Sequence, residues 1–139
     1  RARGFAQRLR EKMPLAVIDK RRPEPNKAVV MNVVGEVENL DAIIFDDMVD
    51  TGKTLILAAR ALLKHGARSV MAVATHPVFS ADAVAKVQKS PLDEIIVTDT
   101  LPLPRKKQIR KIRVLPVASL FADTILRTHR GESVSSLFM

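Results

Sequence analysis

The sequence predicts an α/β fold in which a parallel β-sheet is flanked by helices. Short apolar runs alternate along the chain with segments whose apolar residues recur at helical spacing, and this alternation is typical of parallel sheets with helical crossovers. The chain has 139 residues, of which 47% are hydrophobic, enough for one core of ordinary domain size. We therefore expect a single domain over residues 1–139.

The first expected elements are a helix, a strand and a loop. Phe5, Leu9 and Met13 recur at helical spacing, and Pro14 ends that helix. The apolar run at residues 15–18 is typical of a buried strand, and the polar loop DKRRPEPNK follows it. Because the chain opens with Arg inside a basic amphipathic pattern, we expect it to be a fragment of a longer protein.

The remaining elements repeat a strand-then-helix order. Residues 29–37 are rich in β-branched side chains, and residues 42–45 form an apolar strand that ends at Asp46. A helix is expected from Thr54 to a C-cap at Gly66, because Gly is favoured at helix C-termini. Further strands are expected at 69–75, 94–99 and 112–117, and further helices at 81–89 and 119–129.

Composition narrows the classes of partner. The net charge of +8 and the pI of about 10.3 suit nucleic acid, a membrane surface or a small polyanionic substrate. The five aromatics are all Phe and are not interleaved with the basic clusters, unlike the stacking platforms of single-strand binders. The sequence has no Cys, its three His lack metal-ligand spacing, and no apolar run is long enough to span a membrane. We expect a cytoplasmic protein without nucleic-acid or membrane partners.

The segment IIFDDMVDTGKTL has the residue types of a site that binds an anion and sugar hydroxyls. A strand delivers Asp46 and Asp47 to its carboxyl end, where open α/β sheets bind ligands. The N–H groups of the following turn and first helical turn have no intrahelical partners, so they form an anion site that Gly52 lets a phosphate approach closely. The Thr51 and Thr54 hydroxyls can donate further hydrogen bonds, and the carboxylates suit sugar hydroxyls, directly or through Mg²⁺.

Two other kinds of loop share part of this pattern. A Walker A loop requires Gly four residues before the GKT, but position 47 is Asp. A plain polar turn with a helix cap would also favour Asp, Thr and Gly. Three acids, two Thr and a Gly behind one buried strand are more than such a turn requires.

The run DDMVDTGKT resembles the phosphoribosyl-binding loop shared by type I phosphoribosyltransferases and phosphoribosyl pyrophosphate synthetases. The resemblance implies that Asp46 and Asp47 meet the ribose hydroxyls. It places the 5-phosphate on the residues that follow, which are Asp50, Thr51, Gly52, Lys53 and Thr54.

Flanking segments are similar to the ribose-phosphate pyrophosphokinases, which are the synthetases of that superfamily. They are residues 19–37, VTDTLPLP at 97–104 and GESVSSLF at 131–138. The first resembles the catalytic loop of the synthetases and implies that Lys20 and Arg22 are catalytic, with Arg22 also near the ribose 5-phosphate. The chain would correspond to the C-terminal part of a synthetase, without the N-terminal domain and without the first strand of the sheet.

The resemblance implies transfer of the β,γ-diphosphoryl group of ATP to the 1-hydroxyl of ribose 5-phosphate, with Mg²⁺ as cofactor. It also implies a homo-oligomer, commonly a hexamer, and we expect the isolated chain to be inactive. We expect no metal site made by this chain alone, although Asp46 and Asp47 could act through Mg²⁺.

Alternatives follow from single features. Synthetases usually carry Gly at the position of Lys53, and DTGKT is typical of purine salvage phosphoribosyltransferases. A non-catalytic, synthetase-associated regulatory subunit would keep the fold, although the expected catalytic Lys and loop acids are present here. The +8 charge alone motivates a nucleic-acid-binding module.

Overall fold

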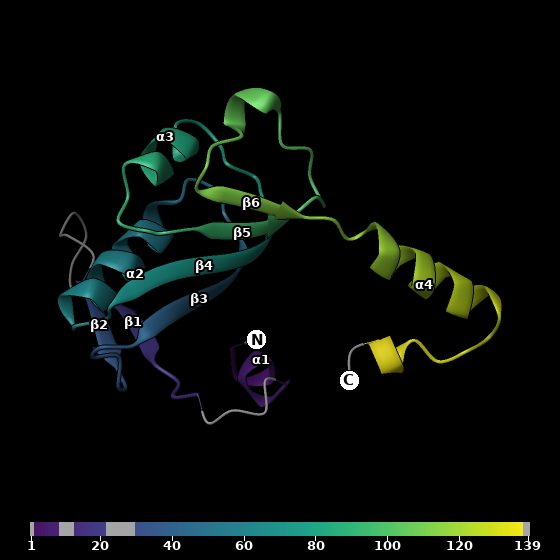
Figure 1. The fold of residues 1–139 in the computed structure, drawn as a ribbon, viewed down its shortest axis with the longest axis horizontal. Helices are drawn as coiled ribbons and strands as arrows, with labels where there is room; N and C mark the ends of the chain where they lie inside the picture. The colour runs from purple at the N-terminus through teal and green to yellow at the C-terminus, as the bar shows by residue number, and fades with distance from the viewer. Residues whose placement is uncertain (1, 9–12, 22–29, 138–139) are drawn as a thin grey trace.

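The computed structural model describes residues 2–8, 13–21 and 30–137. Its centre is a parallel sheet of four strands in the order β3-β4-β5-β6 (Figure 1). The strands are β3 (Asp41–Met48), β4 (Ser69–His76), β5 (Ile95–Thr98) and β6 (Ile112–Leu115). The predicted parallel α/β sheet is therefore confirmed.

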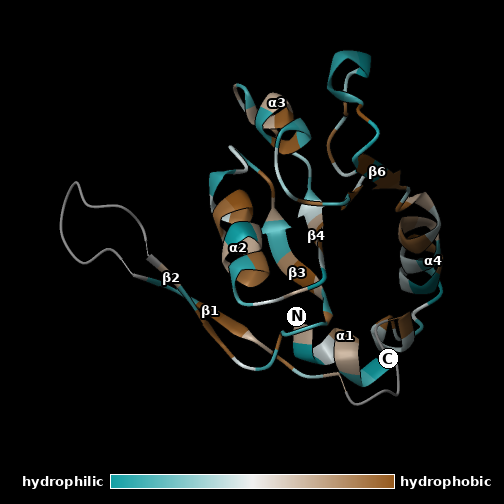
Figure 2. Ribbon diagram, turned by 60° about the vertical axis from the view of Figure 1, so that its left-hand side comes forward, coloured by the Kyte–Doolittle hydropathy of each residue, from teal (hydrophilic) through white to brown (hydrophobic). Residues whose placement is uncertain are grey.

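Helices flank this sheet as expected (Figures 1 and 2). On one face lie α2 (Lys53–Lys64) and α3 (Ala83–Gln88). On the other face, α1 (Ala2–Arg8) places Phe5 against Phe45 of β3, with ring centroids 4.8 Å apart. The last helix, α4 (Ala118–His129), lies away from the sheet beyond β6. It has no buried residue, and its Phe121 and Ile125 are exposed.

The core lies between the sheet and α2. Alternate residues of β4, Val70 to Ala74, are buried, as expected for a strand with one face against helices. They meet a stripe of α2 that includes Leu55, Ala59 and Leu62 at helical spacing. The C-cap is His65, one residue before the predicted position, and Gly66 follows it with φ 91°. The apolar stripe therefore fixes α2 against the sheet and directs its N-terminus to the carboxyl end of β3.

A separate hairpin corrects the predicted first strands. β1 (Val17–Arg21) pairs antiparallel with β2 (Val30–Val34) and forms its own two-stranded sheet. The strand expected at residues 15–18 instead begins at Val17 and continues to Arg21, so the first residues of the expected loop belong to the strand. The rest of that loop, residues 22–27, lies outside the described residues. Pairing across an exposed hairpin needs backbone hydrogen bonds rather than an apolar run, so β1 continues through polar residues.

The short helices complete the described chain. They are η1 (Arg105–Lys107), in the segment of chain that connects β5 to β6, and η2 (Ser135–Leu137) near the end of the chain. No helix among the described residues is both long and apolar enough to cross a membrane.

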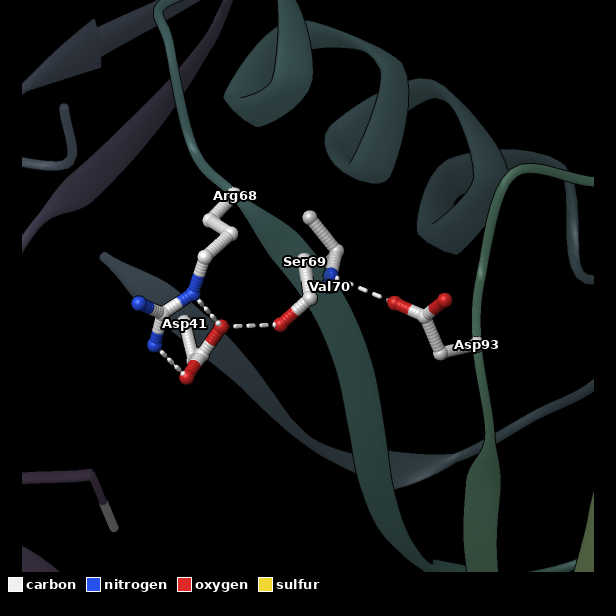
Figure 3. A network of polar contacts seen from close by, with 5 residues as sticks. All are labelled: Asp41, Arg68, Ser69, Val70 and Asp93. Atoms are coloured by element: carbon white, nitrogen blue, oxygen red, sulfur yellow. Dashed lines mark hydrogen bonds and ion pairs between the residues drawn. The ribbon is translucent and has the colours of Figure 1, made fainter. Parts of the chain in front are cut away.

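A polar network ties the amino ends of the strands (Figure 3). The Asp41 carboxylate accepts hydrogen bonds from the guanidinium of Arg68 and the hydroxyl of Ser69, and the Asp93 carboxylate accepts from Val70 N–H at 2.9 Å. The bond from Arg68, and then that from Ser69, lowers the pKa of Asp41 to about 2. The network supports the β3–β4 register at the end of the sheet opposite the candidate site.

Candidate functional site

A hollow of about 260 Å³ opens where β3 gives way to α2. It lies at the carboxyl end of a parallel strand, where ligands bind in open α/β sheets. Its lining consists of Asp46, Asp47, Met48, Val49, Asp50, Thr51, Gly52, Thr54 and Leu55. The structure therefore brings most of the predicted loop residues together around one space.

The two acids belong to the last part of β3. The strand is longer than the apolar run predicted, since it continues through Asp46 and Asp47 to Met48. Each carboxylate accepts a hydrogen bond at 2.9 Å from the next backbone N–H, which restricts its orientation. Both residues are half-buried, and both line the hollow.

The turn after β3 exposes backbone donors. Gly52 is the N-cap of α2 with φ 71°, and a Gly cannot supply a side-chain cap. Within the described residues, no oxygen accepts from the N–H groups of residues 51–55. Because these groups carry the positive end of the helix dipole, they favour an anion. This arrangement differs from the ordinary capped turn considered above, in which a side chain occupies those donors.

A neighbouring segment holds the turn in place. Val49 is buried, its N–H donates to His76 O at 3.0 Å, and its carbonyl accepts from Phe79 N–H at 2.8 Å. Ser80 N–H donates to Asp50 O at 3.2 Å. Sequence analysis missed this support, because residues 76–80 carry no motif and lie far from the loop in the chain.

The remaining predicted site residues do not line the hollow. Lys53 opens α2 and is exposed beside it. Lys20 is exposed near the end of β1, in the separate hairpin, and the structure does not bring it to the lining. Arg22 lies outside the described residues. The catalytic roles of Lys20 and Arg22 therefore stay predictions.

Aspartates are the metal-ligating residues that line the hollow. The described part of the chain contains no group of three or more His, Cys, Asp or Glu that could hold one. Mg²⁺ commonly uses one or two protein carboxylates and completes its shell with water and substrate phosphates. The Asp46 and Asp47 pair fits that mode, in which the substrate supplies further ligands.

Comparison with known proteins identifies the family. Residues 11–139 match the family described as "Phosphoribosyl synthetase-associated domain". The chain belongs to the phosphoribosyl synthetase-associated family. This confirms the resemblance predicted from the loop at residues 46–54 and its flanking segments.

Named proteins and a solved structure are similar to nearly the whole of this chain. A protein named ribose-phosphate pyrophosphokinase from Caldanaerobacter subterraneus subsp. tengcongensis is 54% identical over 138 residues, covering 99% of this chain and 43% of the relative. The protein of the same name from Bacillus subtilis is 49% identical with the same coverage. The crystal structure of phosphoribosylpyrophosphate synthetase from Mycobacterium smegmatis superposes with a TM-score of 0.84 at 36% identity, over 94% of this chain and 41% of that chain. The chain thus spans less than half the length of the relatives it matches, and it corresponds to their C-terminal part.

Proposed function

We propose that this chain forms the ribose 5-phosphate half of a ribose-phosphate pyrophosphokinase active site. The observation that carries the proposal is the hollow at the end of β3, which is lined by carboxylate residues and by a turn whose N–H groups have no acceptor among the described residues. Ribose 5-phosphate has the matching chemistry, since its hydroxyls donate to carboxylates and its dianion suits a helix N-terminus. The names of the relatives support the same substrate class.

In the proposed complex the 5-phosphate lies on the N–H groups of residues 51–55 and the hydroxyls of Thr51 and Thr54. The carboxylates of Asp46 and Asp47 accept from the ribose hydroxyls, which aligns the sugar. Fixing both ends of the acceptor removes much of the entropy cost of reaching the transition state. Mg²⁺ held by these carboxylates and the substrates would neutralise phosphate charge.

The proposed reaction is diphosphoryl transfer. The 1-hydroxyl oxygen attacks the β-phosphorus of ATP, the bond from that phosphorus to the α,β-bridging oxygen breaks, and AMP leaves with that oxygen. The hydroxyl proton is released. Lys20 and Arg22 are proposed to stabilise the charge on the moving group, as cations do in phosphoryl transfer. ATP as second substrate, homo-oligomeric assembly, a cytoplasmic location and one domain over residues 1–139 belong to the same proposal.

Calorimetric titration of the chain with ribose 5-phosphate and Mg²⁺ tests the proposal. Asp46→Ala and Thr54→Val remove groups that line the hollow, and we expect each to weaken binding about tenfold or more. Asp123→Ala and Thr124→Val make the same chemical changes on α4, away from the hollow, and should bind like the wild type. Absence of binding by the folded wild-type chain, or equal losses in both pairs, would contradict the proposal.

Lys53 supports a second candidate, a purine salvage phosphoribosyltransferase, because it completes the sequence DTGKT. Such an enzyme uses the same phosphate loop but a nucleobase and phosphoribosyl pyrophosphate as substrates. Assays of the full-length protein with each substrate pair separate the two. Turnover with ATP and ribose 5-phosphate alone supports the synthetase, and turnover with a nucleobase supports the transferase.

A further inference from the structure

One peptide unit joins the short helix η1 to the loop that lines the hollow. The carbonyl of Phe79 accepts a hydrogen bond from the Lys107 ammonium at 2.7 Å. In the same peptide unit, the N–H of Ser80 donates to the carbonyl of Asp50 at 3.2 Å. A side chain distant in sequence is therefore linked to the backbone of the loop through a single amide plane.

This peptide unit lies in a strained segment. Phe79 has φ 42° and Ala81 has φ 47°, a region that bulky L-residues rarely adopt. Such a conformation persists only where the surrounding structure determines it. The side chain of Phe79 is 0% exposed in the core, and its N–H is bonded to Val49 O. The hydrogen bond from Lys107 adds a restraint on the Phe79 carbonyl.

The charge of Lys107 strengthens the link. A hydrogen bond from an ammonium to a carbonyl is stronger than a neutral one, and it polarises the amide so that its own N–H becomes a better donor. No ion pair with an acid is seen for Lys107 among the described residues, so its ammonium is directed to this carbonyl. The position of the Asp50 backbone therefore depends in part on Lys107.

We propose that Lys107 is a positioning residue for the loop at residues 49–54, and that it holds this loop ready to receive the phosphate. The ligand in this proposal rests on the proposed function, but the restraint on the loop does not. Loss of the bond would let the Phe79–Ser80 peptide rotate, release Asp50 O, and allow the N–H groups of the turn to diverge.

Lys107→Met tests the proposal against a closely matched variant. Lys111, in the same connection between β5 and β6, also donates to a backbone carbonyl, that of Ser90, at 2.7 Å. Lys111→Met therefore removes the same kind of bond at a place remote from the hollow. Lys107→Arg keeps the charge and the donors and should restore the wild-type behaviour.

Two readouts are measured on the 139-residue chain, with thermal melting as a check on folding. In Lys107→Met, hydrogen exchange of the bonded amides that hold the turn, those of Val49, Phe79 and Ser80, should accelerate about tenfold relative to Lys111→Met. The Kd for ribose 5-phosphate should rise about three- to tenfold, with Lys107→Arg near the wild type.

Equal exchange in the Lys107→Met and Lys111→Met variants, or no rescue by Lys107→Arg, would overturn the proposal. If the wild type fails to bind ribose 5-phosphate, the proposed function is contradicted, and the exchange data still decide whether Lys107 holds the loop. If Lys107→Met fails to fold, Lys107→Gln replaces it in the same exchange experiment. Gln retains a weaker, neutral donor, so amide exchange in Lys107→Gln should be faster than in the wild type. Exchange at the wild-type rate in Lys107→Gln would overturn the proposal.

Discussion

Replacement of Gly52 by Ala tests whether the backbone conformation of the turn creates the anion site. Gly52 has φ 71°, and a Cβ added there would lie 3.6 Å from Val87 Cγ2 and 3.8 Å from Ile56 Cδ1. Both are ordinary contacts, so the cost is conformational rather than steric. A left-handed conformation costs an L-residue about 1–2 kcal/mol, which is the expected loss in the free energy of unfolding.

The same strain predicts the effect on binding. If the variant turn instead relaxes to negative φ, the loss in the free energy of unfolding is smaller, its N–H groups turn away from the hollow, and the cost of the left-handed conformation falls on phosphate binding. A difference of about 1–2 kcal/mol corresponds to a Kd about five- to thirtyfold higher. The assays are urea unfolding and calorimetric titration with ribose 5-phosphate.

Gly66→Ala is the matched control at the other end of α2. Gly66 has φ 91°, and a Cβ there would approach Glu38 Cγ to 3.1 Å, so its stability loss should equal or exceed that of Gly52→Ala. Its affinity for ribose 5-phosphate should match the wild type. A Gly52→Ala variant with neither a loss of stability nor a loss of affinity, or a Gly66→Ala variant with equally weakened binding, would refute the reasoning.

Further predictions concern pH, salt and the core. The pKa of Asp41 falls from 3.8 to about 2 on folding, so the carboxyl binds a proton more readily in the unfolded chain, and the stability of the fold declines as pH falls from about 4 to about 2. Asp41→Asn should reduce this decline in thermal melts recorded across that pH range. The same dependence of melting temperature on pH in the variant and the wild type would contradict the prediction. Lys53→Gln should raise the Kd for ribose 5-phosphate about two- to fivefold at low salt and have little effect at high salt. The reason is that Lys53 is exposed outside the hollow, so its charge acts at a distance and is screened by salt. A loss of affinity that does not depend on salt would indicate that Lys53 contacts the phosphate directly. Leu92→Ala should lower the free energy of unfolding in urea by about 2–5 kcal/mol, and Leu120→Ala by less than about 1 kcal/mol. Leu92 is 1% exposed, whereas Leu120 is 41% exposed. Equal losses of stability in the two variants would contradict this difference in burial.

Local patterns predicted the elements that position the site. The helical spacing of apolar residues from Leu55 to Leu62 predicted α2, and the expected start at Thr54 differs by one residue from the observed start at Lys53. Most of the site was predictable because the residues from Asp46 to Thr54 are contiguous, and a strand followed by a helix brings such residues to one edge of the sheet.

The parts that the sequence did not predict depend on contacts between distant segments. β1 extends through Asp19 to Arg21 because it pairs with β2, which polarity along one strand does not indicate. Phe79 looks like any apolar residue, and only the fold shows its positive φ and its bond to the loop. Lys107 cannot be told from Lys106 in a basic run until Phe79 O is placed beside it.

The central claim is that the N–H groups at the start of α2 bind the phosphate of ribose 5-phosphate. Titration of the ¹⁵N-labelled chain with ribose 5-phosphate, followed by NMR amide shifts, tests it most directly. The account predicts saturable changes that are largest at residues 51–55, which surround the hollow. No change there, or saturable changes centred on the basic segment at residues 105–113, would contradict it.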